Sequence, residues 1–451
     1  MKGFLFSTAL LLLAGTSNAQ LSPAITSWLQ NTTATGYYYT NGNATPTSNS
    51  ILVNCQSVQY STNNVYILTK GVPAYTTGPF LDGNPSQATN QNAIFKFPLA
   101  PTQNTGTATA TTMGNIGVFI NGVALFDSRD GVSWKNSTSA LAGGPLGGTG
   151  DGVWNRDAVR AEKGGFDCSK GHPAMGNYHH HQNPSAFKYD LNVISTVCNP
   201  YDANGLYVTD STHHSPLLGY AYDGFPVYGA YGYKNTDGTG GIVRIKSSYQ
   251  QRNITTRTTS PSGSTVTAGP AVSATYPLGY FLEDYAYVSH PEPDYLDVHN
   301  GRFCVTPEYP TGTYAYFCTV DANWNSAYPY AVGPTFYGVW ANRKVTSITE
   351  ATTVYTPTVT AISQVDMDKL TITVYPNPAS DWVVVQIGDL VKYDMDIQFC
   401  DMAGREIYRS SVTKGSTTAY FDTQTLYDGV YLVRIASGKT QVVKKMVIHR
   451  R

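Results

Sequence analysis

Histidines are concentrated in one short segment of the chain, in a pattern that suits a metal site. Four of the nine histidines lie within residues 171–184, GHPAMGNYHHHQNP, and three of them are consecutive. Side chains of a β-strand point alternately to its two faces, so His179 and His181 would share one face and His180 would lie on the other. Two imidazoles two residues apart on a strand can bind one metal ion, and clustered imidazoles suit Cu or Zn.

A complete site needs at least one further ligand. His172 lies beyond the turn PAMG, His213 and His214 precede the aromatic segment GYAYDGFPVYG, and His299 lies in DYLDVHNGRF. Ligation requires a neutral imidazole, so we expect metal binding to weaken as the pH falls through about 6.5. Packing within an aromatic sheet is the alternative for each histidine, and it is the interpretation we favour for His290.

Two residues are expected to support such a site by hydrogen bonding. Tyr178 lies beside the candidate ligands, and Asp223 lies within the aromatic segment YAYDGFP. An aspartate before glycine is also typical of a turn. Asp223 therefore has two interpretations, a turn former and an acceptor that holds a histidine ring in place.

A group of acidic residues could support a different function from metal binding. Six carboxylates lie in one short region among aromatic residues: Glu283, Asp284, Glu292, Asp294, Asp297 and Glu308. Two carboxylates about 5–10 Å apart could cleave a glycosidic bond, with tyrosine and tryptophan rings stacking on the sugar. The alternative for this region is a solvated acidic loop.

The rest of the chain must supply a scaffold, and its composition favours strands. The 451 residues include 34 tyrosines, 42 glycines and 25 prolines, and no amphipathic helical pattern runs for more than a few turns. Short strands joined by turns are expected from such a mixture. We predict an all-β protein, with a large β-rich domain, sandwich- or barrel-like, followed by a small immunoglobulin-like β-sandwich. The net charge of −1 and the 13% of charged residues argue against a nucleic-acid partner.

Shifts in composition divide the chain into five parts. Residues 1–19 have a basic start, a short apolar run and small residues before the expected cleavage point, as in a secretory signal peptide. No other apolar run is long enough to span a membrane in the mature chain. We predict a flexible lead-in over 20–50, the large β domain over 51–342, a Thr-rich linker or lone strand over 343–370, and the small sandwich over 371–451.

Six cysteines in an exported chain can form disulfides. Cys304 and Cys318 flank a segment whose midpoint falls in the turn-like PTG. An antiparallel hairpin centred there would place the two Cα atoms about 5 Å apart, which a disulfide can bridge. Cys168 and Cys198 could form a second bridge, which would leave Cys55 free. Cys400 lies in the separate C-terminal unit and is expected to be a buried, unpaired thiol.

The segments around the histidines resemble the YHYH domain family. The matching pieces are GFDCSKGHPAMGNYHHHQNP, HHSPLLGYAYDGFPVYG, DYLDVHNGRFCVTPEYPTGTYAYF and YPYAVGPTFYG, in the family's order within about residues 117–338. The resemblance implies a secreted, often multidomain protein and suggests metal binding. The first copy of the name motif reads YHHH, and the second, GTYAYF, has Ala315 and Phe317 where histidines would stand. A site that needs both copies could not form, so another histidine would have to complete it.

The last part of the chain resembles the C-terminal sorting domain of the type IX secretion system. The motifs are YPNP, DMAGRE, DGVY and KKM, which begin at Tyr375, Asp401, Asp428 and Lys444. The resemblance implies export to the medium or the outer-membrane surface of a Bacteroidetes-type bacterium, with the type IX machinery as the partner of residues 371–451. An immunoglobulin-like adhesion module is the alternative for this unit.

These observations lead to one main hypothesis and two alternatives. We expect a secreted or cell-surface protein whose YHYH-type domain binds Cu or Zn through clustered histidines. An open coordination position would permit metal-assisted hydrolytic or redox activity. The alternatives are a surface protein that binds extracellular glycans or adheres through its aromatic strands, and a carboxylate-based glycoside hydrolase.

Overall fold

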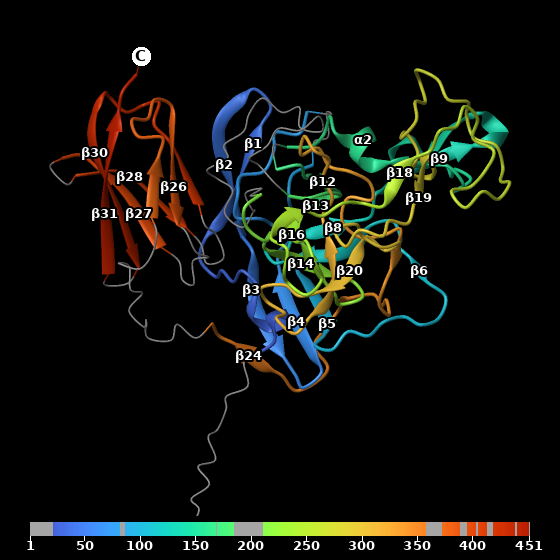
Figure 1. Ribbon diagram of the computed structural model, residues 1–451, viewed down its shortest axis with the longest axis horizontal. Helices are drawn as coiled ribbons and strands as arrows, with labels where there is room; N and C mark the ends of the chain where they lie inside the picture. The colour runs from blue at the N-terminus through green and yellow to red at the C-terminus, as the bar shows by residue number, and fades with distance from the viewer. Residues whose placement is uncertain are drawn as a thin grey trace, which may run out of the picture.

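Among the residues that the structure describes, the regular secondary structure is mostly β-strand, as predicted (Figure 1). The computed structural model describes residues 21–81, 86–167, 169–184, 211–357, 372–387, 395–402, 405–412, 418–437 and 440–450. The predicted signal peptide, residues 1–19, and the predicted pair Cys168 and Cys198 lie outside these residues. In the described part of the chain, no helix is both long and apolar enough to cross a membrane.

The largest sheet carries the histidine-rich segment. Its eight strands lie in the order β12 (His172–Ala174), β13 (Asn177–His180), β8 (Ala124–Phe126), β7 (Asn115–Phe119), β14 (Leu217–Ala221), β15 (Pro226–Tyr228), β21 (Thr313–Phe317) and β20 (Gly301–Cys304). The pairs β13–β8 and β15–β21 are parallel and the others antiparallel. Because β12 and β20 are edge strands, this sheet is open.

A five-stranded sheet shares one hydrophobic core with the largest sheet. Its strands lie in the order β23 (Lys344–Val345), β5 (Ala93–Pro98), β4 (Asn64–Thr69), β3 (Cys55–Tyr60) and β24 (Thr353–Tyr355). Phe97 on β5 packs against Tyr220 on β14, with ring centroids 6.1 Å apart, and Phe95 packs 6.4 Å from Tyr222. The alternating burial of β5 provides these inward-facing rings.

The predicted flexible lead-in is instead packed onto this core. Residues 21–52 form α1 (Pro23–Thr26) and the hairpin of β1 (Thr35–Thr40) and β2 (Asn43–Leu52). Trp28 is only 4% exposed, and its ring lies 5.4 Å from that of Tyr220. The prediction was wrong because a few apolar residues, Trp28 above all, anchor an otherwise polar segment.

The predicted linker also contributes strands. Within residues 343–357, β23 pairs with β5 and β24 pairs with β3, while residues 358–370 lie outside the described part of the chain.

Shorter elements complete the large unit. One is a three-stranded sheet of β10 (Ala140–Gly143), β9 (Arg129–Lys135) and β11 (Asn155–Asp157). Three strand pairs follow: β16 (Tyr231–Tyr233) with β17 (Ile242–Arg244), β18 (Tyr249–Gln251) with β19 (Tyr285–Tyr287), and β22 (Thr335–Phe336) with β6 (Thr109–Ala110). The helical elements are α2 (Ala158–Glu162) and the 3₁₀ turns η1 (Asn136–Thr138), η2 (Gly144–Leu146) and η4 (Leu282–Asp284).

The C-terminal unit has two small sheets around its own core. One contains β25 (Ile372–Tyr375), β26 (Trp382–Ile387) and β29 (Thr418–Asp422), and the other β28 (Glu406–Val412), β27 (Met395–Cys400), β30 (Gly429–Ser437) and β31 (Thr440–Ile448). Apolar side chains of both sheets, including Phe399 and Phe421 with centroids 4.2 Å apart, form one cluster. This is the small β-sandwich that the sequence predicted, and it contains Cys400 as a buried free thiol.

The predicted disulfide between Cys304 and Cys318 does not form, and both thiols are free and buried. In the hairpin of β20 and β21, Cys304 lies opposite Thr313. The prediction placed the turn at the PTG segment. The chain turns earlier, because the backbones of Thr306 and Tyr309 hydrogen-bond to each other, which shifts the register and separates the two cysteines.

Candidate metal centre

The histidine-rich segment folds as a tight hairpin. β12 and β13 pair antiparallel, with His172 directly opposite His179. The two-residue turn consists of Met175 and Gly176, both with positive φ, 48° and 84°. Positive φ angles at both central residues are typical of a type I′ turn, whose twist matches that of the two paired strands. The hairpin therefore holds His172 and His179 as cross-strand neighbours on one face.

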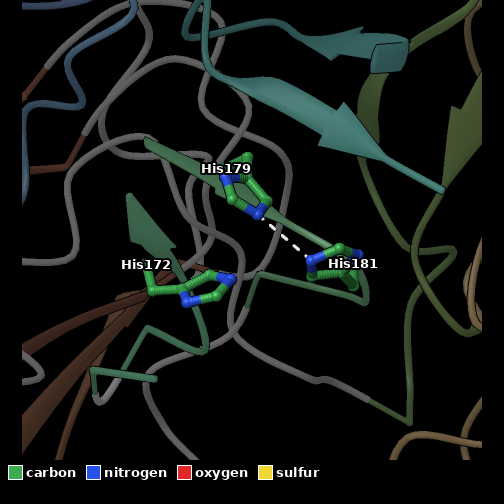
Figure 2. Close-up of side chains that lie close together, drawn as sticks. All are labelled: His172, His179 and His181. Atoms are coloured by element: carbon green, nitrogen blue, oxygen red, sulfur yellow. Dashed lines mark hydrogen bonds between the residues drawn. The ribbon is translucent and has the colours of Figure 1, made fainter. Parts of the chain in front are cut away.

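Three imidazoles meet on this face (Figure 2). His181 follows β13 and points to the same side as His179, as strand alternation requires. One ligand atom from each of His172, His179 and His181 lies within 4.8 Å of the other two, and all three residues are buried. Among the described residues, this is the only group of three or more histidine, cysteine or acidic side chains with such an arrangement.

The ring nitrogens of His179 and His181 have fixed roles. Nδ1 of His179 lies 2.8 Å from the carbonyl oxygen of Asn177, and Nδ1 of His181 contacts the carbonyl oxygen of Asp127. A carbonyl oxygen only accepts, so each Nδ1 carries a proton and donates it. In the neutral rings, both Nε2 atoms then present lone pairs toward each other across 3.1 Å. Metal-binding histidines characteristically donate their second nitrogen in this way.

Glu162, at the end of helix α2, adds a carboxylate to the cluster. Its Oε2 lies 3.2 Å from Nε2 of His172 and 3.1 Å from Nε2 of His181. Asp157 begins the helix and accepts hydrogen bonds from the backbone N–H groups of Val159 and Arg160. This cap stabilises a helix of only five residues and so places Glu162 against the imidazoles.

Polar atoms at the centre of the cluster are buried without hydrogen bonds. Oε2 of Glu162 and both ring nitrogens of His172 form none, although Oε2 and Nε2 are in contact. A buried polar atom without a partner costs about 1–3 kcal/mol. The cluster thus brings three imidazoles and a carboxylate together and leaves some of their buried polar atoms without a hydrogen bond, which is an arrangement that a bound cation would complete.

The charges within the cluster are strongly coupled. Burial acts to raise the pKa of Glu162, but His172 and His181 outweigh it and hold the pKa well below its usual range. Burial acts to lower the pKa of His181, but the Glu162 carboxylate outweighs it and raises the pKa. Burial, with repulsion from His172 and His181, lowers the pKa of His179 far below its ordinary value. At neutral pH the cluster therefore offers an ionised carboxylate and a neutral His179.

Aromatic rings enclose the imidazoles. Phe126 on β8 stacks on His179, with centroids 3.7 Å apart, and Phe166 meets His172 edge-on at 5.0 Å. These rings restrict the motion of the ligands and keep water away from their sides. A dry, rigid wall of this kind strengthens interactions with a bound cation.

The other face of β13 carries a separate hydrogen-bond network. Nε2 of His180 lies 2.7 Å from the hydroxyl of Tyr75, and burial lowers the pKa of His180 to about 3. The hydroxyl of Tyr178 donates to Oδ2 of Asp167 across 2.8 Å. His180 is therefore a neutral, packed residue that points away from the cluster.

Asp167 connects this network to the strand that carries His172. Its Oδ2 also accepts the N–H of Gly78, and its Oδ1 accepts the N–H groups of Ser169 and Gly171. These bonds fix the turn that leads directly into His172. Tyr178 is thus hydrogen-bonded to Asp167 and, through it, linked to the turn before His172, while its role in supporting a metal site stays a prediction.

The remaining predicted ligands lie outside the three-histidine group. His214 is buried among the rings of Tyr228, Tyr233 and Phe317. Nδ1 of His299 lies 2.7 Å from the hydroxyl of Thr335. The ring of His213 forms a hydrogen bond with the hydroxyl of Thr212.

Asp223 and the acidic region have partners of their own. Asp223 accepts from the hydroxyl of Tyr316 and from the N–H groups of Phe225 and Gly338, which is a turn-forming role. None of these partners is a histidine. The six carboxylates of the acidic region pair separately: Glu283 with Asn155, Asp284 with Arg257, Glu292 with His290, Asp294 with Lys246, Asp297 with Tyr314 and Glu308 with Tyr228.

Sequence reasoning did not identify Glu162. A five-residue helix leaves almost no periodic signal, and nothing in the segment AVRAEKGG marks its glutamate as a ligand. The only available hint was an acidic residue shortly before the first clustered histidine, after an aspartate able to cap a helix.

Comparisons with known proteins agree with the two resemblances. A family model described as YHYH protein matches residues 94–329, which is more than half of the chain. A second model, described as secretion system C-terminal sorting domain, matches residues 373–449. No curated protein matches the chain. The first match includes Glu162 and all three histidines of the cluster.

Proposed function

The chain belongs to the YHYH protein family, and we propose that its YHYH-type domain binds one divalent transition metal ion between His172, His179 and His181, with Glu162 as a fourth ligand. Its sorting domain makes it a secreted or cell-surface protein handled by the type IX secretion system. The proposed metal function is thus exerted outside the cell.

One observation carries the proposal. The Nε2 atoms of His179 and His181 face each other at 3.1 Å while both Nδ1 atoms are engaged with carbonyl oxygens. Two lone pairs at this distance repel, and the nearby Oε2 of Glu162 adds a third acceptor. A divalent cation between these atoms would replace the repulsion with three favourable contacts. A proton on His181 would relieve the repulsion only in part.

The donor set and its spacing favour zinc, with copper as the alternative. Zn–N bonds of 2.0–2.1 Å in a tetrahedron separate neighbouring ligand atoms by about 3.3 Å. Three of the six separations come close to this value: 3.1 Å for His179 and His181, 3.1 Å for His181 and Glu162, and 3.2 Å for His172 and Glu162. The three imidazole ligand atoms lie within 4.8 Å of one another. Three imidazoles and one carboxylate also suit Cu(II), which prefers a flatter geometry.

Metal analysis of the secreted protein tests the proposal. We expect the purified chain, after incubation with Zn²⁺ or Cu²⁺ and removal of excess, to retain about one equivalent by mass spectrometry, as one four-ligand site requires. The variant His179→Ala/His181→Ala should lose this metal, and His290→Ala, which removes an imidazole outside the cluster, should keep it. A parent protein that retains neither metal would refute the proposal. Retention by the double variant would place the site elsewhere.

A further inference from the structure

Glu162 differs from the three histidines in its access to water. Its side chain is 23% exposed, against 8% for His172 and 2% for His181. Its chain neighbours Ala161 and Lys163 are both exposed. Glu162 is thus the residue of the cluster whose side chain reaches the surface, while its Oε2 atom is itself buried against the imidazoles.

The four ligands also differ in how firmly the fold holds them. His172 and His179 are opposite each other in a paired hairpin, and His179 and His181 are each fixed by an Nδ1 hydrogen bond. Glu162 instead ends a five-residue helix, and its Oε2 contacts Nε2 of His172 and of His181, at 3.2 and 3.1 Å, the atoms with which it would share the metal. A carboxylate on a short surface helix can turn away without disturbing the sheet.

We propose that Glu162 is the exchangeable ligand of the metal centre, and that small carboxylates and similar monoanions bind the metal in its place. This inference rests on the proposed metal function. In the exchange, the bond from the metal to Oε2 breaks and a bond to an oxygen or nitrogen of the incoming anion forms. Glu162 keeps its negative charge and turns into solvent, so no proton or electron is transferred.

The charge and surroundings of the centre select the class of ligand. With three neutral imidazoles, a divalent metal centre has a net charge of +2. The carboxylate of Glu162 reduces this charge to +1, and a monoanion in its place would do the same. Phe126 and Phe166 lie against His179 and His172, and an incoming ligand would take the place of Glu162, the residue of the cluster with the most exposed side chain. A small planar anion such as acetate has the shape and the oxygen donors of the side chain that it replaces.

Cobalt substitution makes the exchange visible, because the absorption spectrum of bound Co²⁺ responds to each change of ligand. We expect acetate and azide to shift the spectrum of the wild-type Co²⁺ protein saturably. In Glu162→Ala the same anions should bind at least tenfold more tightly, since the competing carboxylate is gone, and Glu162→Gln should lie between the two. Lys163→Ala, an exposed neighbour, should behave as the wild type.

The outcomes separate this inference from the proposed function. A wild-type protein that takes up no Co²⁺ would overturn both. Uptake of Co²⁺ with spectra that acetate and azide leave unchanged, in the wild type and in Glu162→Ala, would overturn the exchange alone. A Glu162→Ala spectrum identical to that of the wild type before any anion is added would show that Glu162 is not a ligand and would likewise overturn it. Circular dichroism of each variant monitors its folding.

Discussion

The Nε2 atoms of His179 and His181 lie 3.1 Å apart, with both rings already donating from Nδ1 to backbone carbonyl oxygens. The fold maintains this close approach because β13 pairs with β8 and because His181 is held by the carbonyl of Asp127. An arrangement that brings acceptors together in a buried place is unfavourable by itself. The metal ion proposed above would lie among these acceptors and relieve their repulsion.

Metal removal should destabilise the large domain. The proposed site connects α2, β12 and β13, so a bound ion stabilises the folded state but not the unfolded chain. Free Zn²⁺ at about 100 times its dissociation constant should add about 2.7 kcal/mol to the free energy of unfolding. Urea denaturation followed by tryptophan fluorescence, with and without a chelator, measures this difference. His172→Ala should show no such difference, and an equal response in that variant would contradict the assignment.

Asp167 should control metal affinity without touching the metal. Its two carboxylate oxygens hold the hydroxyl of Tyr178 and the turn before His172. Asp167→Ala removes all of these acceptors, and we expect metal affinity to fall by about 10- to 100-fold, as for other residues that orient ligands. Asp167→Asn retains one acceptor oxygen and should recover part of the loss. Isothermal titration with Zn²⁺ provides the measurement, and equal affinity in all three proteins would argue against a positioning role.

Strand periodicity was sufficient to predict the faces of the histidine run. A period of two places His179 with His181 and sends His180 to the opposite side, and nothing beyond the local backbone is needed for this inference. The partner across the hairpin, His172, was among several candidates, because the two-residue turn at Met175 and Gly176 decides the register and the sequence did not distinguish it from a longer one.

Long-range packing decided the features that sequence reasoning missed. Glu162 reaches the cluster only because α2 folds against the hairpin, and no local pattern encodes that approach. The register of Cys304 opposite Thr313 depends on a turn at Thr306 and Tyr309 that competes with the more obvious glycine turn. Trp28 similarly anchors the N-terminal segment through contact with Tyr220, some 190 residues later in the chain, and local sequence does not encode this contact.

The buried ion pair of Arg257 and Asp284 should be essential to folding. Both side chains are fully buried, and Nε and one terminal nitrogen of the arginine each lie 2.8 Å from a carboxylate oxygen. Asp284→Ala leaves the guanidinium buried without a counter-charge, which costs about 3–5 kcal/mol. The control is Glu292→Ala, which removes a 55% exposed carboxylate from the same acidic region and should change stability little. Denaturation midpoints compare the two, and similar midpoints would refute the prediction.

His214 should make the stability of the large domain depend on pH. Burial lowers its pKa to about 4; a hydrogen bond to the Ser215 carbonyl opposes this, and the charge of Arg302 adds to it. The unfolded value is about 6.5, so between pH 4 and 6.5 the unfolded chain binds more protons than the folded one. The contribution of His214 to the free energy of unfolding is therefore fully present above pH 6.5 and is lost as the pH falls toward 4.

The variant His214→Phe isolates this effect. One pKa unit corresponds to about 1.36 kcal/mol, so a fall of the pKa from 6.5 to about 4 makes the contribution of His214 about 3 kcal/mol across the window. A phenyl ring can occupy the same aromatic surroundings of Tyr228, Tyr233 and Phe317 without taking up a proton. We expect the free energy of unfolding of the variant to fall less steeply than that of the wild type between pH 6.5 and 4. Urea titrations at half-unit intervals measure both profiles. Parallel profiles would mean that the protonated His214 ring is accommodated in the folded state.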